Sequence, residues 1–437
     1  MMEEIRRVCV EDMLRARDAR AERQQKLLAA HHTPLISFTM NIAGDVKYDR
    51  QIRRAFDEGV RRILRRAEHM DFPVLDRITT INFTGCEAIF SVHADARLLK
   101  EQMYLIEEAD ALGRLFDIDV LDESGNHLSR GTERACLICG APARACARSR
   151  AHDAPELYRK AHAIIEEHFR EEYVRFIGET AQRALLYEAL TTPKPGLVDC
   201  LDNGAHSDMN LFSFADSACA LRPYFEVCAR MGAENAALPR LQYAGQLAED
   251  AMYAAAGVNT HKGAIFALGI LCYAAGSCQE FSGVDAIFEK SASVGSFFLG
   301  QMKASPHVQT GGEIQYRQFG LTGARGEAAS GFASVKTVAL PALKSALNKG
   351  KPLHEAGLYA LISLMRHVKD SNIIRRAGID AQEYVFQQAQ LALDEGLSES
   401  VLREMNQSFI RRNISPGGCA DLLAAAYFLY FLESRHA

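Results

Sequence analysis

The sequence predicts an N-terminal α+β domain followed by a mainly all-α domain, because its pattern changes part-way along the chain. Up to about residue 175, strand-like and helix-like segments alternate, whereas long Ala/Leu-rich stretches replace the strand signals from about Ala181. The chain of 437 residues also exceeds the usual size of a single domain. We therefore expect two domains, residues 1–177 and residues 178–437, joined through a helix that crosses the boundary.

The N-terminal domain carries three strand-like segments rich in β-branched and aromatic residues, at residues 34–43, 78–94 and 114–121. Residues 48–70 place apolar side chains at helical spacing between the first two segments, and residues 96–113 do the same before the third. These elements predict a mixed or mostly antiparallel sheet that is covered by helices.

The C-terminal domain is predicted to be built from helices, several of them apolar on most faces and therefore buried. The stretches that carry this pattern are residues 215–231, 241–257, 263–276, 383–397 and 421–433.

Composition and charge argue against several classes of protein. A net charge of −5 gives no reason to expect nucleic-acid binding, and no uninterrupted apolar stretch approaches the length of a membrane span. The charged N-terminal segment lacks the apolar core of a signal peptide, and eleven scattered cysteines, an odd number, fit reduced thiols. We expect a cytoplasmic protein with no nucleic-acid or membrane partner.

The segment "GRLFDIDVLD" carries the sharpest chemical signal of the N-terminal domain. Strand side chains alternate between faces, so Asp117 and Asp119 point the same way and can share a divalent cation such as Mg²⁺. Metal-assisted nucleotidyl transfer uses such a pair to bind a triphosphate, and the flanking Arg114 and Arg130 match phosphate oxygens. A solvent-facing acidic strand without a metal is the alternative.

Cysteines form a second motif in this domain. Cys136, Cys139, Cys146 and His152 have the spacing C-x₂-C-x₆-C-x₅-H, which is compatible with a Cys₃His zinc site. The connection is short for a typical zinc finger, and reduced cysteines that pack beside helices are common. The pattern by itself therefore favours structural thiols over zinc.

Four polar, glycine-bearing clusters interrupt the helical domain. Their chemistry suggests a polyphosphate plus a metal, with lysine and arginine supplying charge and carboxylates acting as metal ligands or bases. Each cluster also has a structural explanation, such as a helix start at Ser415 and Pro416. No Walker or Rossmann glycine motif is present, so a nucleotide would be held in another way. The candidate residues are Lys194, Asp199, His206 and Asp208; Asn259, His261 and Lys262; Arg325 and Glu327; and Ser415, Gly417, Gly418 and Asp421.

Nearly the whole chain resembles two known enzyme families in succession. "TPKPGLVD", "GAHSDM", "GVNTHKGAIF", "GARGEAASGF" and "NISPGGCADLLA" resemble the triphosphoribosyl-dephospho-coenzyme A synthase family. "TGCEAIF", "GRLFDIDVLD", "LSR" and "RACLICGAPARACARSRAH" resemble the citrate lyase holo-acyl-carrier-protein synthase, the apo-citrate lyase phosphoribosyl-dephospho-coenzyme A transferase. The order is that of the known fused form.

The synthase resemblance implies that the 2′-hydroxyl of 3′-dephospho-coenzyme A attacks the anomeric carbon of the ATP ribose and releases adenine. Inversion through an oxocarbenium-like transition state needs a carboxylate base, for which Asp208 and Glu327 are the candidates. We expect lysine and arginine to hold phosphates, Asn259 and His261 to orient the ligand, and Asp199 and Asp421 to bind metal. The phosphate-binding candidates are Lys194, Lys262 and Arg325.

The transferase resemblance implies a nucleotidyltransferase-like domain in which a serine of the citrate lyase acyl carrier subunit (gamma chain) attacks the α-phosphorus of that product. Asp117 and Asp119 would hold Mg²⁺, while Arg114 and Arg130 would steady the departing pyrophosphate. Three alternatives remain: the same synthase chemistry serving malonate decarboxylase, a non-catalytic nucleotide-binding protein, and a hydrolase that transfers the ribosyl group to water.

Overall fold

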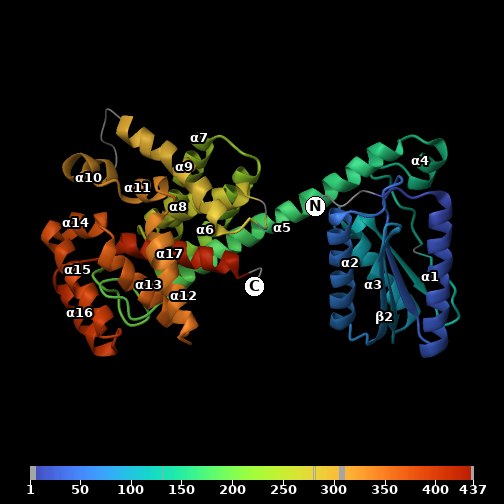
Figure 1. The fold of residues 1–437 in the computed structure, drawn as a ribbon, viewed down its shortest axis with the longest axis horizontal. Coiled ribbons are helices and arrows are strands. Elements are labelled where there is room, and N and C mark those ends of the chain that lie inside the picture. Colours follow the sequence, from blue (N-terminus) through green and yellow to red (C-terminus); the bar gives the residue numbers. More distant parts are fainter. Residues whose placement is uncertain (1–5, 130, 279, 281, 305–310, 435–437) are drawn as a thin grey trace. The chain divides into compact units, whose positions relative to one another are not determined.

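The computed structural model describes residues 6–129, 131–278, 280, 282–304 and 311–434 (Figure 1). The chain divides into two compact units, Met1–Arg170 and Glu171–Ala437. One helix, α5 (Ala154–Leu190), begins in the first unit and ends in the second, as the sequence predicts for the boundary region.

The N-terminal unit is an α+β fold, as its alternating segments predict. Helix starts are fixed locally: Asp49 accepts a 2.9 Å hydrogen bond from the N–H of Ile52, and Asp95 accepts one of 2.9 Å from Leu98. The further elements are α1 (Val10–His31), β1 (Leu35–Met40), α2 (Arg50–His69), β2 (Val74–Asn82), β3 (Gly85–Val92), α3 (Ala96–Glu108), β4 (Phe116–Leu121) and α4 (Ala143–Ser149).

The described sheet is antiparallel throughout, with strand order β2-β3-β1-β4, so of the two expected arrangements the antiparallel one is confirmed and the mixed one is not. The reason lies in residues 78–94, which form parts of two strands rather than one. The chain reverses between Asn82 and Gly85, whose φ is +120°, and β3 returns beside β2. Strands that run the same way are therefore never neighbours: β3 separates β1 from β2, and β1 separates β3 from β4. This is the order of a split βαβ arrangement.

Alternate residues of the strands face two separate apolar clusters. Ile36, Phe38 and Ile118 pack with residues of α2 and α3, whereas Leu35 and Leu121 pack with Leu27 of α1 on the opposite face. Asp117 and Asp119 alternate with Phe116, Ile118 and Val120 and therefore share the face covered by α1. The alternation in "FDIDVL" that the sequence predicts is confirmed.

The C-terminal unit is helical in all its described elements. Its helices are α6 (Leu211–Ala233), α7 (Leu238–Ala256), α8 (Lys262–Ser277), α9 (Val284–Ala304), α10 (Gly311–Phe319), α11 (Gly323–Ala329), α12 (Leu340–Asn348), α13 (Leu353–His367), α14 (Ser371–Ala377), α15 (Ile379–Asp394), α16 (Glu399–Arg411) and α17 (Gly417–Glu433). Among the described residues, no helix combines the length and apolar character needed to cross a membrane.

Two central helices, α8 and α17, are buried along nearly their whole length, which explains why both are apolar on most faces. Helix α8 packs closely on α6, because a Cβ at Gly276 would lie 1.9 Å from the carbonyl oxygen of Ala229. Helix α17 also packs on α8. This core brings together the beginnings of α8 and α17, the two helix starts that carry predicted site residues.

Candidate functional site

A pocket of about 1690 Å³ in the C-terminal unit is lined by residues from all four polar clusters of the sequence. The wall includes Lys194, His206 and Asp208; Asn259, His261 and Lys262; Arg325 and Glu327; and Ser415, Gly417, Gly418 and Asp421. Segments that are far apart in sequence therefore meet at one site.

The first cluster is a loop whose charges are mostly engaged within the protein. The Lys194 ammonium is buried and lies 2.5 Å from a carboxylate oxygen of Glu188, which also lines the pocket. Asp199 does not line the pocket; its carboxylate accepts hydrogen bonds from the N–H groups of Lys194 (2.7 Å) and Leu201 (2.7 Å). Asp199 therefore fixes the loop, and the structure gives no support to its predicted role as a metal ligand.

His206 joins the first cluster to the fourth through a 2.8 Å hydrogen bond between its Nε2 and the Ser415 hydroxyl. Burial, followed by the nearby Arg376 guanidinium, lowers the pKa of His206 below its usual value. Asp208, two residues on, is mostly exposed, and its carboxylate lies 3.9 Å from Nδ1 of His206. Asp208 thus occupies the open rim of the pocket.

At the start of α8, most of the amide groups that could bind a phosphate already have internal partners. Asn259 accepts from the N–H of Lys262 (3.2 Å), and the N–H of His261 points to the Met252 sulfur at 3.2 Å. The Lys262 ammonium lies 2.5 Å from Glu249. Backbone N–H groups of this cluster therefore have partners within the protein, and its side chains line the pocket.

His261 is buried on the pocket wall, with its Nδ1 2.7 Å from the Ser217 hydroxyl. Burial and then the charge of Lys194 lower the pKa of His261 to about 3, so the ring is neutral. Its Nε2 is buried and makes no hydrogen bond to any described residue. A neutral ring with one free nitrogen fits the predicted role of orienting a ligand.

Asp421 reaches from α17 to the start of α8, where its carboxylate accepts a hydrogen bond from the N–H of Ala264. Gly263 makes room for this contact, because a Cβ there would lie 1.9 Å from Oδ2 of Asp421. Burial, then the charges of Asp370 and Glu188, raise the pKa of Asp421 well above the usual range.

Glu327 is held with a defined orientation at the end of α11. One carboxylate oxygen accepts from the N–H of Ser334 at 2.7 Å and the other accepts from its hydroxyl at 3.0 Å. Ser334 immediately precedes a π-helical turn, Val335–Ala339. Burial raises the pKa of Glu327 although these hydrogen bonds oppose the shift.

Asp370 is the main site residue that the sequence reasoning missed. It is fully buried and accepts hydrogen bonds from the N–H of Asn372 (2.8 Å) and of Cys419 (2.9 Å), which joins α14 to the start of α17. The sequence predicts a helix start at Ser415 and Pro416, but the Ser415 side chain does not cap α17. Pro416 directly precedes the helix, and Asp370 accepts the hydrogen bond from the N–H of Cys419 in its first turn. The sequence signal for Asp370 was the segment "DSN", which is typical of a helix start, before the two arginines of α14.

Further cations on the pocket wall were also missed: Lys369, Arg375 and Arg376. They extend the positive charge supplied by Lys262 and Arg325. The guanidinium of Arg325 lies 3.9 Å from the carboxylate of Glu313.

In the N-terminal unit, Asp117 and Asp119 lie opposite Thr39 and Ser37 of β1, on the face covered by α1. The side chain of Asp117 is half exposed. The pKa of its carboxyl group is raised, first by partial removal from water and then by the charge of Asp119. Glu87 of β3, which the sequence reasoning missed, lies on the same face next to Thr39. Two carboxylates this close, with the pKa of Asp117 raised, form a negatively charged face that a divalent cation would stabilise.

Arginines from two directions approach these carboxylates. Arg20 and Arg23 of α1 pair with Glu87, and a guanidinium nitrogen of Arg134 lies 3.6 Å from Asp117. The predicted Arg114 instead donates to the carbonyl of Ala135 at 2.7 Å. The predicted Arg130 lies outside the described residues, four positions before Arg134.

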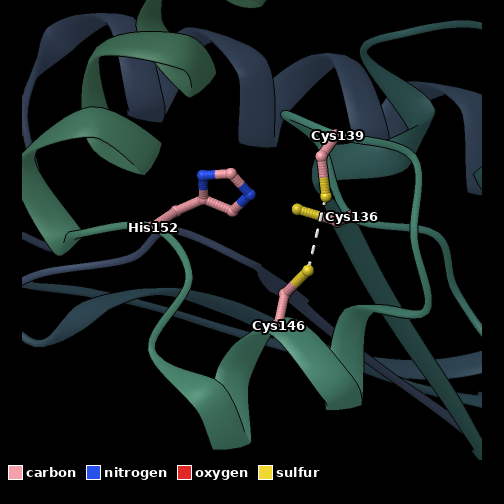
Figure 2. Close-up of side chains that lie close together, drawn as sticks. All are labelled: Cys136, Cys139, Cys146 and His152. Carbon is pink, nitrogen blue, oxygen red and sulfur yellow. Dashed lines mark hydrogen bonds between the residues drawn. The ribbon is translucent and has the colours of Figure 1, made fainter.

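The cysteine motif is also assembled. The side chains of Cys136, Cys139, Cys146 and His152 converge, and their ligand atoms all lie within 4.8 Å of one another (Figure 2). Of the groups of three or more His, Cys, Asp or Glu in the described part of the chain, this one alone has metal-site spacing. Among the described residues, Asp199 and Asp421 belong to no such group, and neither does the pair Asp117 and Asp119.

Comparison with known proteins accounts for both units. The family model of apo-citrate lyase phosphoribosyl-dephospho-CoA transferase matches residues 8–168, and that of ATP:dephospho-CoA triphosphoribosyl transferase matches residues 174–437. A Haemophilus influenzae protein called Protein CitXG is 34% identical over 459 residues, which cover 98% of this chain and 97% of the relative. The chain belongs to the CitXG family.

Other relatives agree with this assignment. A Protein CitXG of Leuconostoc mesenteroides is 32% identical over 450 residues, covering 94% of this chain and 95% of that protein. A probable 2-(5''-triphosphoribosyl)-3'-dephosphocoenzyme-A synthase of Vibrio cholerae is 42% identical over 276 residues, 59% of this chain and 88% of that protein. As a CitXG protein, the chain is a bifunctional transferase that makes the citrate lyase prosthetic group and attaches it. The N-terminal match favours citrate lyase over the malonate decarboxylase alternative.

Proposed function

We propose that the pocket of the C-terminal unit joins ATP to 3′-dephospho-coenzyme A, and that the α1-covered face of the N-terminal unit transfers the product to a carrier serine. The synthase activity is assigned to residues 178–437 and the transferase activity to residues 1–177. The observation that carries the first assignment is the convergence of four polar clusters on one pocket of about 1690 Å³. Pockets for one small ligand commonly measure about 300–1,000 Å³, so this one has room for two nucleotides.

In the synthase reaction, the 2′-hydroxyl oxygen of dephospho-coenzyme A bonds to the anomeric carbon of ATP while the bond to adenine breaks. Glu327 is the better candidate for the base that takes the hydroxyl proton. Its carboxylate is oriented by Ser334 and its pKa is raised by burial, whereas Asp208 is mostly exposed on the rim. Adenine leaves as the neutral base after taking a proton from solvent, which balances the proton that the carboxylate removes from the hydroxyl, and the triphosphate stays on the transferred ribose.

We assign phosphate binding in this pocket to cations whose charge is only partly neutralised by neighbouring carboxylates. Lys262 and Arg325 keep the role that the sequence predicted, and Arg375 and Lys369 join them on the wall. Lys194 is different, because its ammonium is paired with Glu188 in a buried setting. We assign to Lys194 the task of holding Glu188 and the loop in place.

In the transferase reaction, the carrier serine oxygen bonds to the α-phosphorus of the intermediate, while the bond from that phosphorus to the bridging oxygen of the β-phosphate breaks. Pyrophosphate departs, and the serine proton passes to solvent. Arg134 and the arginines of α1 are close enough to the carboxylates to bind the leaving pyrophosphate. We assign to Arg134 the pyrophosphate-binding role expected of Arg114, because Arg114 donates to the carbonyl of Ala135 instead. The nucleotidyltransferase-type chemistry is retained in this proposal and does not depend on the sheet being mixed.

Mg²⁺ fits the N-terminal face better than the pocket. Asp117 and Asp119 share one face of β4, and the pKa of Asp117 is raised by burial and by its neighbour's charge, which a divalent cation would offset. When bound there, Mg²⁺ would neutralise charge on the triphosphate. In the pocket, Asp421 already caps α8, so we assign the metal to the N-terminal face.

The test is to incubate the full chain with ATP, Mg²⁺ and 3′-dephospho-coenzyme A and follow free adenine by chromatography. A parallel reaction adds the apo acyl carrier subunit and records its mass. Adenine that depends on the coenzyme A precursor, together with a heavier carrier and pyrophosphate, supports both assignments. Adenine without the precursor would indicate a ribosyl hydrolase, and no adenine would leave a nucleotide-binding protein.

A further inference from the structure

The cysteine motif forms a small module that lacks an apolar core. Within residues 131–150, of which all are described, Cys136 is the only buried residue, and α4 buries none of its side chains. A segment that buries so little apolar surface needs another source of stability, such as a metal or a disulfide.

The first two cysteines lie on a tight turn, "CLICG", of the kind that presents two sulfurs to one ion. The N–H of Gly140 donates to the carbonyl of Cys136 at 3.1 Å, and Cys136 N–H donates to Ala141 at 2.6 Å. The N–H of Ile138 points to the Cys136 sulfur at 3.5 Å. Gly140 has φ +73°, the left-handed conformation that closes such a turn at little cost.

The other two side chains come from α4 and from the residues that follow it. The Cys146 sulfur lies 3.4 Å from that of Cys139. His152 follows the left-handed residue Arg150, and its Nε2 is buried without a hydrogen-bond partner in the described structure. Figure 2 shows the three sulfurs and the imidazole turned toward one another.

The second nitrogen of His152 has the partner that a metal-bound histidine usually has. Its Nδ1 lies 3.4 Å from a carboxylate oxygen of Glu156, one helical turn along. A carboxylate in this position fixes the ring orientation and leaves Nε2 as the free lone pair. A disulfide between Cys139 and Cys146 would explain neither Cys136 nor this histidine.

We propose that Cys136, Cys139, Cys146 and His152 bind one structural zinc ion in a closed tetrahedral site. Three thiols lose their protons to solvent on binding, and the histidine binds as the neutral ring, so the complex carries one net negative charge. All four positions are filled by protein, which leaves none for a substrate.

The ion would hold the module against the start of β4, next to the carboxylate pair. Arg134, two residues before Cys136, donates to the carbonyl of Phe116 at 2.9 Å and lies 3.6 Å from Asp117. From the other side, Arg114 donates to Ala135 at 2.7 Å. Zinc therefore fixes the segment that places Arg134 at the proposed transferase site.

The experiment measures metal in the full chain, produced with zinc in the medium and purified under reducing conditions without chelator. Mass spectrometry of the metal should find about one zinc ion per chain, and X-ray absorption should find three sulfur ligands at about 2.3 Å and one nitrogen at about 2.0 Å. Cys139→Ser and His152→Ala should lose most of the zinc. Cys219→Ser, which alters an exposed cysteine of α6, should keep it.

A milder variant covers the case in which ligand loss unfolds the module. Glu156→Gln should keep zinc but lower its affinity about 10-fold to 100-fold in competition with a chelator. Wild-type protein without zinc after growth in zinc, a Cys139–Cys146 disulfide in freshly reduced-purified chain, or full zinc in both ligand variants would each overturn the proposal.

Discussion

Asp421 of α17 caps the first turn of α8 through the N–H of Ala264, with Gly263 providing the space for the carboxylate. A helix start attracts anions because of its free N–H groups and its dipole. In this protein the hydrogen-bond acceptor is the carboxyl group of Asp421, supplied by a neighbouring helix of the same unit. The relationship explains why "NTHKGAIF" and "NISPGGCADLLA" occur together: one supplies the helix start and the other its cap.

Replacing Asp421 separates a capping role from metal binding. Asp421→Ala should lower the free energy of unfolding by about 1 kcal/mol through the lost cap, whereas Asp421→Asn keeps an acceptor oxygen. Because burial raises the folded-state pKa of Asp421, ionisation disfavours the folded state above its ordinary pKa of 3.8. The stability of Asp421→Asn relative to wild type should therefore increase from pH 4 to pH 7 in denaturant titrations. Stabilisation of wild type by Mg²⁺ that Asp421→Asn abolishes would show a metal ligand instead.

Glu327→Gln tests the choice of base. The amide keeps the shape and can still accept from Ser334 through one oxygen, but it cannot take a proton. We expect kcat for adenine release to fall about 10²-fold to 10⁴-fold. Asp208→Asn is the matched control and should cost less than 10-fold, since Asp208 lies on the exposed rim. The reverse order of effects would move the base to Asp208.

The pH dependence of adenine release should report the same carboxylate. The base works only when ionised, so activity is present at high pH and is lost as the pH falls through its folded-state pKa. Because burial raises that pKa, the acid limb of kcat/KM should lie above 4.5, the ordinary value for glutamate. A limb at or below 4.5 in wild type would argue against Glu327.

The buried pair of Lys194 and Glu188 should be strongly coupled. Lys194→Met leaves a buried carboxylate without its partner and should destabilise the chain by about 3–5 kcal/mol. The double variant Lys194→Met, Glu188→Leu removes both charges and should recover most of that loss. Denaturant unfolding of the four proteins forms a double-mutant cycle, and additive effects would show that the two residues act independently.

The parts of the fold that follow local rules could be predicted from sequence. Alternation in "FDIDVL" placed Asp117 and Asp119 on one face, and helical spacing predicted α2 and α3. The direction of neighbouring strands was not predictable in this way, because it depends on which strands meet across the crossovers. One short turn at Gly85 converts an expected strand into a hairpin.

The site could be predicted as a set of motifs but not as a set of contacts. Glycine-bearing polar loops marked the wall of the pocket. Asp370, the cap residue before α14, and Glu188, within α5, gain their roles at the site only through packing. Asp199 is the opposite case: it belongs to a motif, but its carboxylate accepts hydrogen bonds from backbone N–H groups of its own loop. The sequence pattern favoured structural thiols over zinc, and only the converging side chains reverse that preference.

The most direct test of the central claim, that two sites on one chain perform successive steps, uses two variants in sequence. Asp117→Asn is incubated with ATP, Mg²⁺ and 3′-dephospho-coenzyme A, and the protein-free filtrate is given to Glu327→Gln together with the apo carrier. We predict adenine in the first step, and pyrophosphate and a heavier carrier in the second, although neither variant loads the carrier alone. Loss of adenine in Asp117→Asn, or wild-type adenine release by Glu327→Gln, would contradict the account.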